Sequence, residues 1–149
     1  MILRNFALEK GSHAIALEGL GRYWDLHAFA RLESLRYVMA DNVAELTWKV
    51  QQIENPWGDR TNTATGCLLR FNNVGVLKVM QGDDQATRED QCVSSISQID
   101  KREHPLSEPV EFRMRREWKS GDEFGLLIIL QSGRTIEIQA ESADLIALR

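Results

Sequence analysis

The stretch Ala44-Glu45-Leu46-Thr47-Trp48-Lys49-Val50 alternates apolar and polar side chains with a period of two. Neighbouring side chains of a β-strand point to opposite faces of a sheet, so this alternation predicts a strand with one buried face. The same period is cleanest in Val110–Trp118, where Arg116 is the single departure, and it returns in Thr135–Ala140. These stretches predict that the chain folds mainly into strands.

Two short polar sequences have the composition of tight turns between apolar runs. Asn72-Asn73 divides residues 68–79, and Ser132-Gly133 divides residues 128–138. Asn and Gly tolerate the left-handed backbone conformation that a tight turn needs. Each of the two sequences therefore predicts a β-hairpin.

Residues 110–140 are predicted to form a three-stranded meander. A turn sequence at residues 120–123 joins the Val110 strand to the apolar run that begins at Phe124. That run is apolar on both faces, which is typical of a strand covered on both sides. The alternating charges of Val110–Trp118 indicate a solvated face with cross-strand ion pairs.

Two segments each keep two interpretations. Residues 21–30 fit either a short helix or a strand, and the residues after them fit a strand that turns at 40–42. Residues 89–99 fit either a strand or a short helix capped near Glu89 and Asp90. Both segments are too short for their periodicity to decide.

The number and spacing of the predicted strands define a fold class. About nine to eleven short strands, with a turn every ~8–12 residues, are typical of an antiparallel β-sandwich or a partly open barrel. The predicted fold is all-β or nearly so, with at most one or two short helices. The 149 residues fit a single β-rich domain, 1–149, which can bury a core without disulfides or metal.

Charge and hydropathy exclude several classes of partner. The net charge of −4 provides no basic surface for nucleic acid or an anionic membrane. The longest apolar run, Phe124–Leu130, is far shorter than the ~20 residues that span a bilayer. No secretory signal is recognisable, so we expect a cytoplasmic location with Cys67 and Cys92 reduced and buried.

The residues that usually carry chemistry are scattered along the chain. His13, His27 and His104 are isolated, and neither Cys-x-x-Cys nor a Gly-x-Ser-x-Gly nucleophile elbow occurs. The sequence therefore predicts no metal, no cofactor and no catalytic residue. His27 is expected to be a partly buried histidine with satisfied hydrogen bonds.

Residues 54–66 form a long polar segment between strong strand patterns. Ordered domains rarely keep ~13 residues without secondary structure unless the loop has a role. Trp57, Asp59, Arg60 and Asn62 lie in this segment, and Trp and Arg are common anchors of protein interfaces. These residues are candidate contacts for a partner or a ligand. The other interpretation is that Trp57 folds back over one end of the core, with Asp59 pairing with Arg60 or capping a turn.

Two segments resemble a known group of proteins. One comprises Trp24–His27, Arg31–Leu35 and Leu46–Trp48, and the other is Cys67–Leu77. Together they are similar to the strand signature of small bacterial β-rich proteins that include predicted immunity proteins of toxin systems. In that group a Leu-His-Asp-Ala strand start precedes hairpins with a Leu-x-Phe-x-x-Val pattern, whereas this chain has Ala28 at the aspartate position. The resemblance spans roughly residues 24–80 and implies a β fold without established catalytic residues.

Two functional hypotheses follow from these observations. The leading hypothesis is a small non-enzymatic β domain that binds a protein partner, with toxin neutralisation and self-association as its two versions. The alternative is an enzyme or a small-ligand carrier with a pocket in the barrel mouth or between sheets. That pocket would use His27, Asp59, Arg60 and Arg70.

Overall fold

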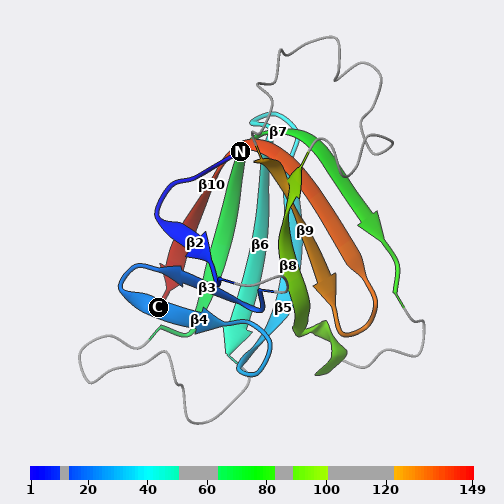
Figure 1. Cartoon of the computed structure of the whole chain (residues 1–149). Helices are drawn as coiled ribbons and strands as arrows, with labels where there is room; N and C mark the ends of the chain where they lie inside the picture. Colours follow the sequence, from blue (N-terminus) through cyan, green and yellow to red (C-terminus); the bar gives the residue numbers. More distant parts are fainter. Residues whose placement is uncertain (11–13, 51–63, 83–88, 101–122) are drawn as a thin grey trace.

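The computed structural model describes residues 1–10, 14–50, 64–82, 89–100 and 123–149, which form two antiparallel sheets (Figure 1). The large sheet has the order β5 (Ala30–Val38), β6 (Val43–Val50), β7 (Gly66–Met80), β10 (Thr135–Leu148), β9 (Glu123–Leu130) and β8 (Val93–Asp100). The short strand β1 (Ile2–Leu3) pairs in parallel with β10. The small sheet consists of β2 (Phe6–Leu8), β3 (Ala16–Gly19) and β4 (Arg22–Asp25).

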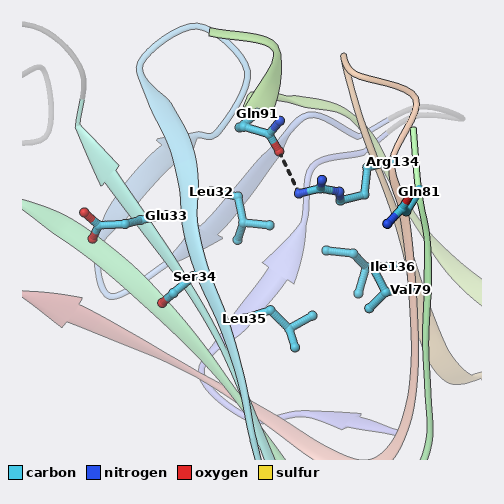
Figure 2. A pocket seen from close by; sticks show the side chains of 9 residues that line it. All are labelled: Leu32, Glu33, Ser34, Leu35, Val79, Gln81, Gln91, Arg134 and Ile136. Carbon is cyan, nitrogen blue, oxygen red and sulfur yellow. Dashed lines mark hydrogen bonds between the residues drawn. The ribbon is translucent and has the colours of Figure 1, made fainter. Parts of the chain in front are cut away.

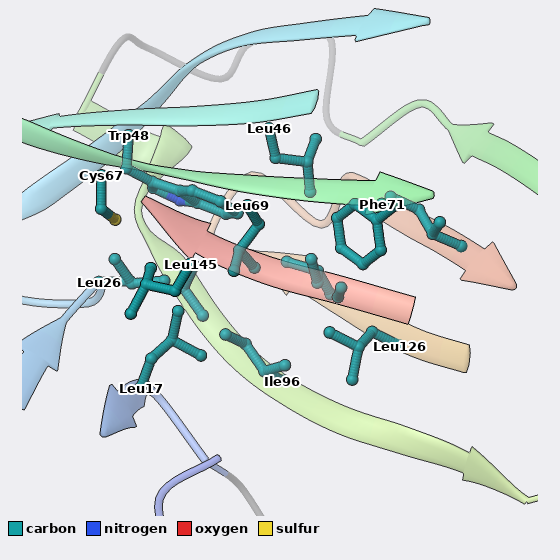
Figure 3. Close-up of a cluster of buried hydrophobic side chains, with 14 of the residues drawn as sticks. Leu17, Leu26, Leu46, Trp48, Cys67, Leu69, Phe71, Ile96, Leu126 and Leu145 are labelled. Carbon is teal, nitrogen blue, oxygen red and sulfur yellow. The ribbon is translucent and has the colours of Figure 1, made fainter. Parts of the chain in front are cut away.

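The large sheet curls into a half-barrel, and the small sheet packs on its concave side (Figure 1). The prediction of a nearly all-β chain is confirmed, and the partly open barrel is the version that the chain adopts. Side chains of both sheets meet in one buried cluster, where Leu17 and Leu26 point toward Leu145 (Figure 3). Burying one such side chain stabilises the fold by about 1.5–3 kcal/mol.

Polar contacts attach the small sheet to two strands of the half-barrel. The side chain of Asn5 donates to the Leu145 carbonyl of β10 at 2.8 Å and accepts from the Leu145 amide at 2.7 Å. On the other side, the Ile96 amide of β8 donates to the Ala14 carbonyl at 2.6 Å. The small sheet therefore bridges β10 and β8 across the concave face.

Strand β6 confirms the pattern of its sequence. Ala44, Leu46 and Trp48 are buried, whereas Lys49, which is also a residue of β6, is exposed. The turn expected at residues 40–42 also occurs, because Asn42 has a φ of 52° and its amide donates to the Met39 carbonyl at 3.4 Å. This turn joins β5 to β6.

The hairpin predicted at Asn72-Asn73 is wrong, because both residues lie inside the continuous strand β7. A two-residue hairpin turn of the common type needs positive φ at both central residues, and of this pair only Asn73 has it, at 52°. The Asn72 amide group donates to Asp144 at 2.8 Å and the Asn73 amide group donates to Glu141 at 2.7 Å. These bonds hold the pair against β10, and an irregularity in the β7–β10 register follows directly after them.

The hairpin predicted at Ser132-Gly133 is confirmed. Gly133 has a φ of 75°, and its amide donates to the Leu130 carbonyl at 2.9 Å. Strand β9 is flanked by β10 and by β8, so β8 occupies the place expected for the Val110 strand. Residues 110–118 themselves lie outside the described residues.

The two ambiguous segments are now assigned. Residues 22–25 form β4, and the helix considered for 21–30 does not form. The Asp25 carboxylate accepts hydrogen bonds from the backbone amides of His27 and Ala28, at 2.9 and 2.8 Å. Such a side-chain bond offers the backbone a turn in place of a helix. In residues 89–99, the 3₁₀ helix η1 (Glu89–Gln91) precedes strand β8, so both structures occur in succession.

Candidate ligand-binding cleft

A cleft of about 250 Å³ lies between β5 and the paired ends of β7 and β10 (Figure 2). Leu32 and Leu35 form one wall, and Val79 and Ile136 form the other. We call this site the β5–β10 cleft. Among the described residues, its lining is Leu32, Glu33, Ser34, Leu35, Val79, Gln81, Gln91, Arg134 and Ile136.

A β-bulge in β5 explains why both leucines face the cleft. In a regular strand, residues three apart point to opposite faces. The β5–β6 register shifts between Leu32 and Ser34, which leaves Glu33 as an extra residue. Leu32 is therefore opposite Trp48 and Leu35 is opposite Leu46, and both of these β6 side chains point into the core. The bulge turns Leu35 to the same face of β5 as Leu32, and the two side chains form one apolar wall.

The second wall depends on a close approach of two chain segments. Val79 and Ile136 are direct partners in the β7–β10 ladder. Just beyond Val79, a Cβ atom on Gly82 would lie 2.0 Å from the Ser132 carbonyl oxygen and 2.4 Å from the Arg134 nitrogen. Only glycine permits this approach. The contact fixes the position of the residues just before β10, including Arg134.

One end of the cleft is polar. A space of about 310 Å³ at this end is lined by Arg31, Leu32, Glu33, Gln91 and Arg134. The Arg134 guanidinium donates to the Gln91 side-chain oxygen at 3.4 Å, and Figure 2 shows this pair above the apolar walls. The polar end therefore holds the Arg134 guanidinium and the neutral Gln91 amide, with Arg31, Leu32 and Glu33 completing its described lining.

The Glu33 carboxylate does not neutralise these arginines. It lies 2.8 Å from the Lys49 ammonium, and Figure 2 shows it pointing away from Val79 and Ile136. Within the described parts of the chain, no carboxylate forms an ion pair with Arg31 or Arg134. The guanidinium of Arg134 therefore faces the cleft without a carboxylate partner among the described residues.

His27 is a half-buried histidine with hydrogen-bond partners, as its sequence context predicted. Its Nδ1 atom lies 2.8 Å from the Val93 carbonyl oxygen and 3.3 Å from the Gln131 side-chain nitrogen. These contacts connect the turn after β4 to the start of β8. His27 does not line the β5–β10 cleft.

Arg70 belongs to a row of alternating charges on the outer face of the half-barrel. Its guanidinium donates to the Glu45 carboxylate at 3.0 and 2.7 Å. Neighbouring strands extend the row, because Glu45 is opposite Arg36 and Arg70 is opposite Asp144. Arg70 is thus ion-paired with Glu45 on the outer face, and it does not line the β5–β10 cleft. The other candidates, Trp57, Asp59, Arg60 and Asn62, lie outside the described residues.

Burial accounts for both cysteines. Neither Cys67 nor Cys92 is in a disulfide and both are buried, as the sequence predicted. Removal from water raises the pKa of the Cys67 thiol well above its usual range, because burial disfavours the thiolate. A thiol in this state is a poor nucleophile.

Comparison of the chain with protein-family models, curated proteins and solved structures gave no match. The resemblance to immunity proteins accordingly remains a prediction. Among the described residues, no helix has the length and hydropathy needed to cross a bilayer. The same residues contain no group of three or more His, Cys, Asp or Glu side chains suited to a metal ion.

Sequence reasoning missed every residue of the cleft. Arg134 follows a turn that was predicted, yet nothing in the sequence places it near Gln91 or Leu32. The available signal was Glu33, a charged residue that interrupts the alternation between Leu32 and Leu35. Such an interruption is compatible with a bulge, although the sequence does not show which strand lies opposite.

Proposed function

We propose that this protein binds a small organic molecule in the β5–β10 cleft. The function is the small-ligand carrier that the sequence offered as its alternative. Its pocket, however, is the β5–β10 cleft and not a pocket at His27, Asp59, Arg60 and Arg70. The observation that carries it is the convergence of two apolar walls, from β5 and from the β7–β10 pair, below the Arg134–Gln91 pair. Ligand sites typically combine an apolar lining with a few polar groups that fix orientation.

The exposure of the walls supports binding over a purely structural role. Leu32 and Leu35 are half-buried and Val79 is 49% exposed, although their neighbours Trp48 and Leu46 are completely buried. Covering these apolar surfaces with a ligand would release water and favour association by roughly 25 cal/mol per Å². The cleft therefore has a driving force for taking up an apolar group.

A titration with 1-octanol followed by amide NMR tests this function. We expect shifts concentrated at residues 32–35, 79–81 and 134–136. The variant Val79→Trp, which fills the cleft from an exposed position, should lose these shifts. Ile146→Trp is the matched control, because Ile146 is 37% exposed on β10 and does not line the cleft. Shifts scattered over the surface, or unchanged in Val79→Trp, would refute the proposal.

Binding of a protein partner remains the prediction made from the sequence. It depended on residues 54–66, of which the described structure includes only residues 64–66. The β5–β10 cleft neither requires nor excludes such a partner.

A further inference from the structure

We infer that the ligand of the β5–β10 cleft is a small amphipathic monocarboxylate, with its carboxylate on the Arg134 guanidinium. This inference rests on the proposed function and adds the chemical class and the orientation of the ligand. The hydrocarbon chain would lie between the Leu32–Leu35 wall and the Val79–Ile136 wall.

The first argument is the separation of polar and apolar groups along the cleft. Arg31 lines only the polar space, whereas Leu35, Val79 and Ile136 line only the apolar one. Leu32, Glu33, Gln91 and Arg134 line both spaces and mark the boundary between them. A ligand that matches this arrangement has one polar end and one apolar end.

The second argument is the sign of the charge at the polar end. The Arg134 guanidinium lies at this space, Arg31 is a further lining residue, and the carboxylate of Glu33 is paired with Lys49 at 2.8 Å. The hydrogen bond from Arg134 to the neutral Gln91 amide is long, at 3.4 Å, and uses one of the five N–H donors of arginine. Charged hydrogen bonds from arginine to a carboxylate are shorter and stronger. An anion is therefore the better partner.

The third argument is the size of the cleft. A volume of about 250 Å³ corresponds to on the order of ten non-hydrogen atoms, because a water molecule occupies about 30 Å³ in the liquid. A carboxylate with a straight chain of about eight carbons has this size. Larger acids would extend beyond the walls.

Three probes of equal chain length test the inference: octanoate, 1-octanol and octylammonium. Binding is measured by amide NMR titration of the wild type, Arg134→Gln, Arg31→Gln and the matched control Arg36→Gln. Arg36 lies on the same strand as Arg31, is exposed and does not line the cleft. Arg134→Lys keeps the charge and replaces the forked geometry of the guanidinium.

We expect octanoate to bind at least about tenfold more tightly than octanol, since a hydrogen bond from arginine to a carboxylate is stronger than one to a neutral hydroxyl. Arg134→Gln should remove most of this preference by weakening octanoate binding far more than octanol binding. Arg31→Gln should have the smaller effect, and Arg134→Lys should restore part of the preference. Arg36→Gln should behave as the wild type.

Two results would overturn the inference in distinguishable ways. If octanol or octylammonium binds the cleft as tightly as octanoate, the proposed function stands and the carboxylate assignment is wrong. If none of the three probes shifts the cleft residues, the proposed function is wrong as well. An octanoate preference that persists in Arg134→Gln and in Arg31→Gln would place the anion elsewhere and would also refute the inference.

Discussion

The concave face of the half-barrel has two halves that are built from similar side chains and serve different purposes. Where the small sheet bridges β10 and β8, inward-facing residues such as Trp48, Leu69 and Leu145 are completely buried. Where β5 faces the β7–β10 pair, Leu35 and Val79 retain contact with solvent. An apolar side chain on a strand therefore becomes core or binding surface according to what packs over it.

The sharpest test of this comparison is a pair of truncations, one in each half. Phe71→Ala in the covered half should lower the free energy of unfolding by about 3–5 kcal/mol, because it leaves a cavity. Val79→Ala in the cleft should lower it by less than about 1 kcal/mol, because the side chain is already exposed. Urea denaturation measures both values. Equal losses would show that the two halves are packed alike.

The glycine that shapes the cleft gives the next effect. Gly82→Ala places a methyl group against the Ser132 carbonyl, and we expect a loss of about 1–3 kcal/mol in the free energy of unfolding, as for other overpacked sites. Displacement of Arg134 should also weaken octanoate binding. Gln81→Ala, one residue earlier, controls for stability and should stay within about 0.5 kcal/mol of the wild type.

The small sheet that covers the other half contains a strained turn. Leu20 has a φ of 56° and Gly21 a φ of 72° in the tight turn between β3 and β4. The left-handed conformation costs a residue with a Cβ atom about 1–2 kcal/mol, and Asn tolerates it better than Leu. Leu20→Asn should therefore raise the free energy of unfolding by about 1 kcal/mol. In Leu20→Val the free energy of unfolding should fall. A lower free energy of unfolding in Leu20→Asn than in the wild type would contradict this explanation.

The outer charge row should contribute less than either half of the concave face. Arg70→Gln is expected to change the free energy of unfolding by less than about 1 kcal/mol, because exposed ion pairs are screened by water and salt. A double-mutant cycle with Glu45→Gln at low and high NaCl measures the coupling. A coupling that did not decrease with salt would argue against a simple surface ion pair.

The smallest effect concerns a hydrogen bond beside the small sheet. The Tyr23 hydroxyl donates to the Glu9 carboxylate at 2.5 Å, and this bond raises the pKa of Tyr23 from 10.0 to about 12. Because the folded-state pKa lies above the unfolded value, the contribution to stability is complete below pH 10 and is lost as the pH rises through 12. Ultraviolet titration of the wild type against Tyr23→Phe should show this late ionisation, and a Tyr23 pKa near 10 would contradict the hydrogen bond.

Strand content was predictable because period-two alternation depends only on which residues are neighbours in the chain. Strand β6 and the turn at Gly133 follow from local preferences alone. The hairpin predicted at Asn72-Asn73 was wrong, although Asn73 does have the left-handed backbone conformation expected of this pair. A single positive φ is compatible with a bulge as well as a hairpin, and the bonds of both side chains to β10 favour the continuous strand.

The amino-acid sequence by itself determined that this chain forms strands, and which side chains of β6 turn inward, because alternation is a local property. The tertiary structure alone decided that Leu32 and Leu35 share a wall and that Arg134 lies over Ile136. Residues so far apart in the chain meet only after the sheet has curled. For that reason the cleft, and the ligand class inferred from it, became visible only in three dimensions.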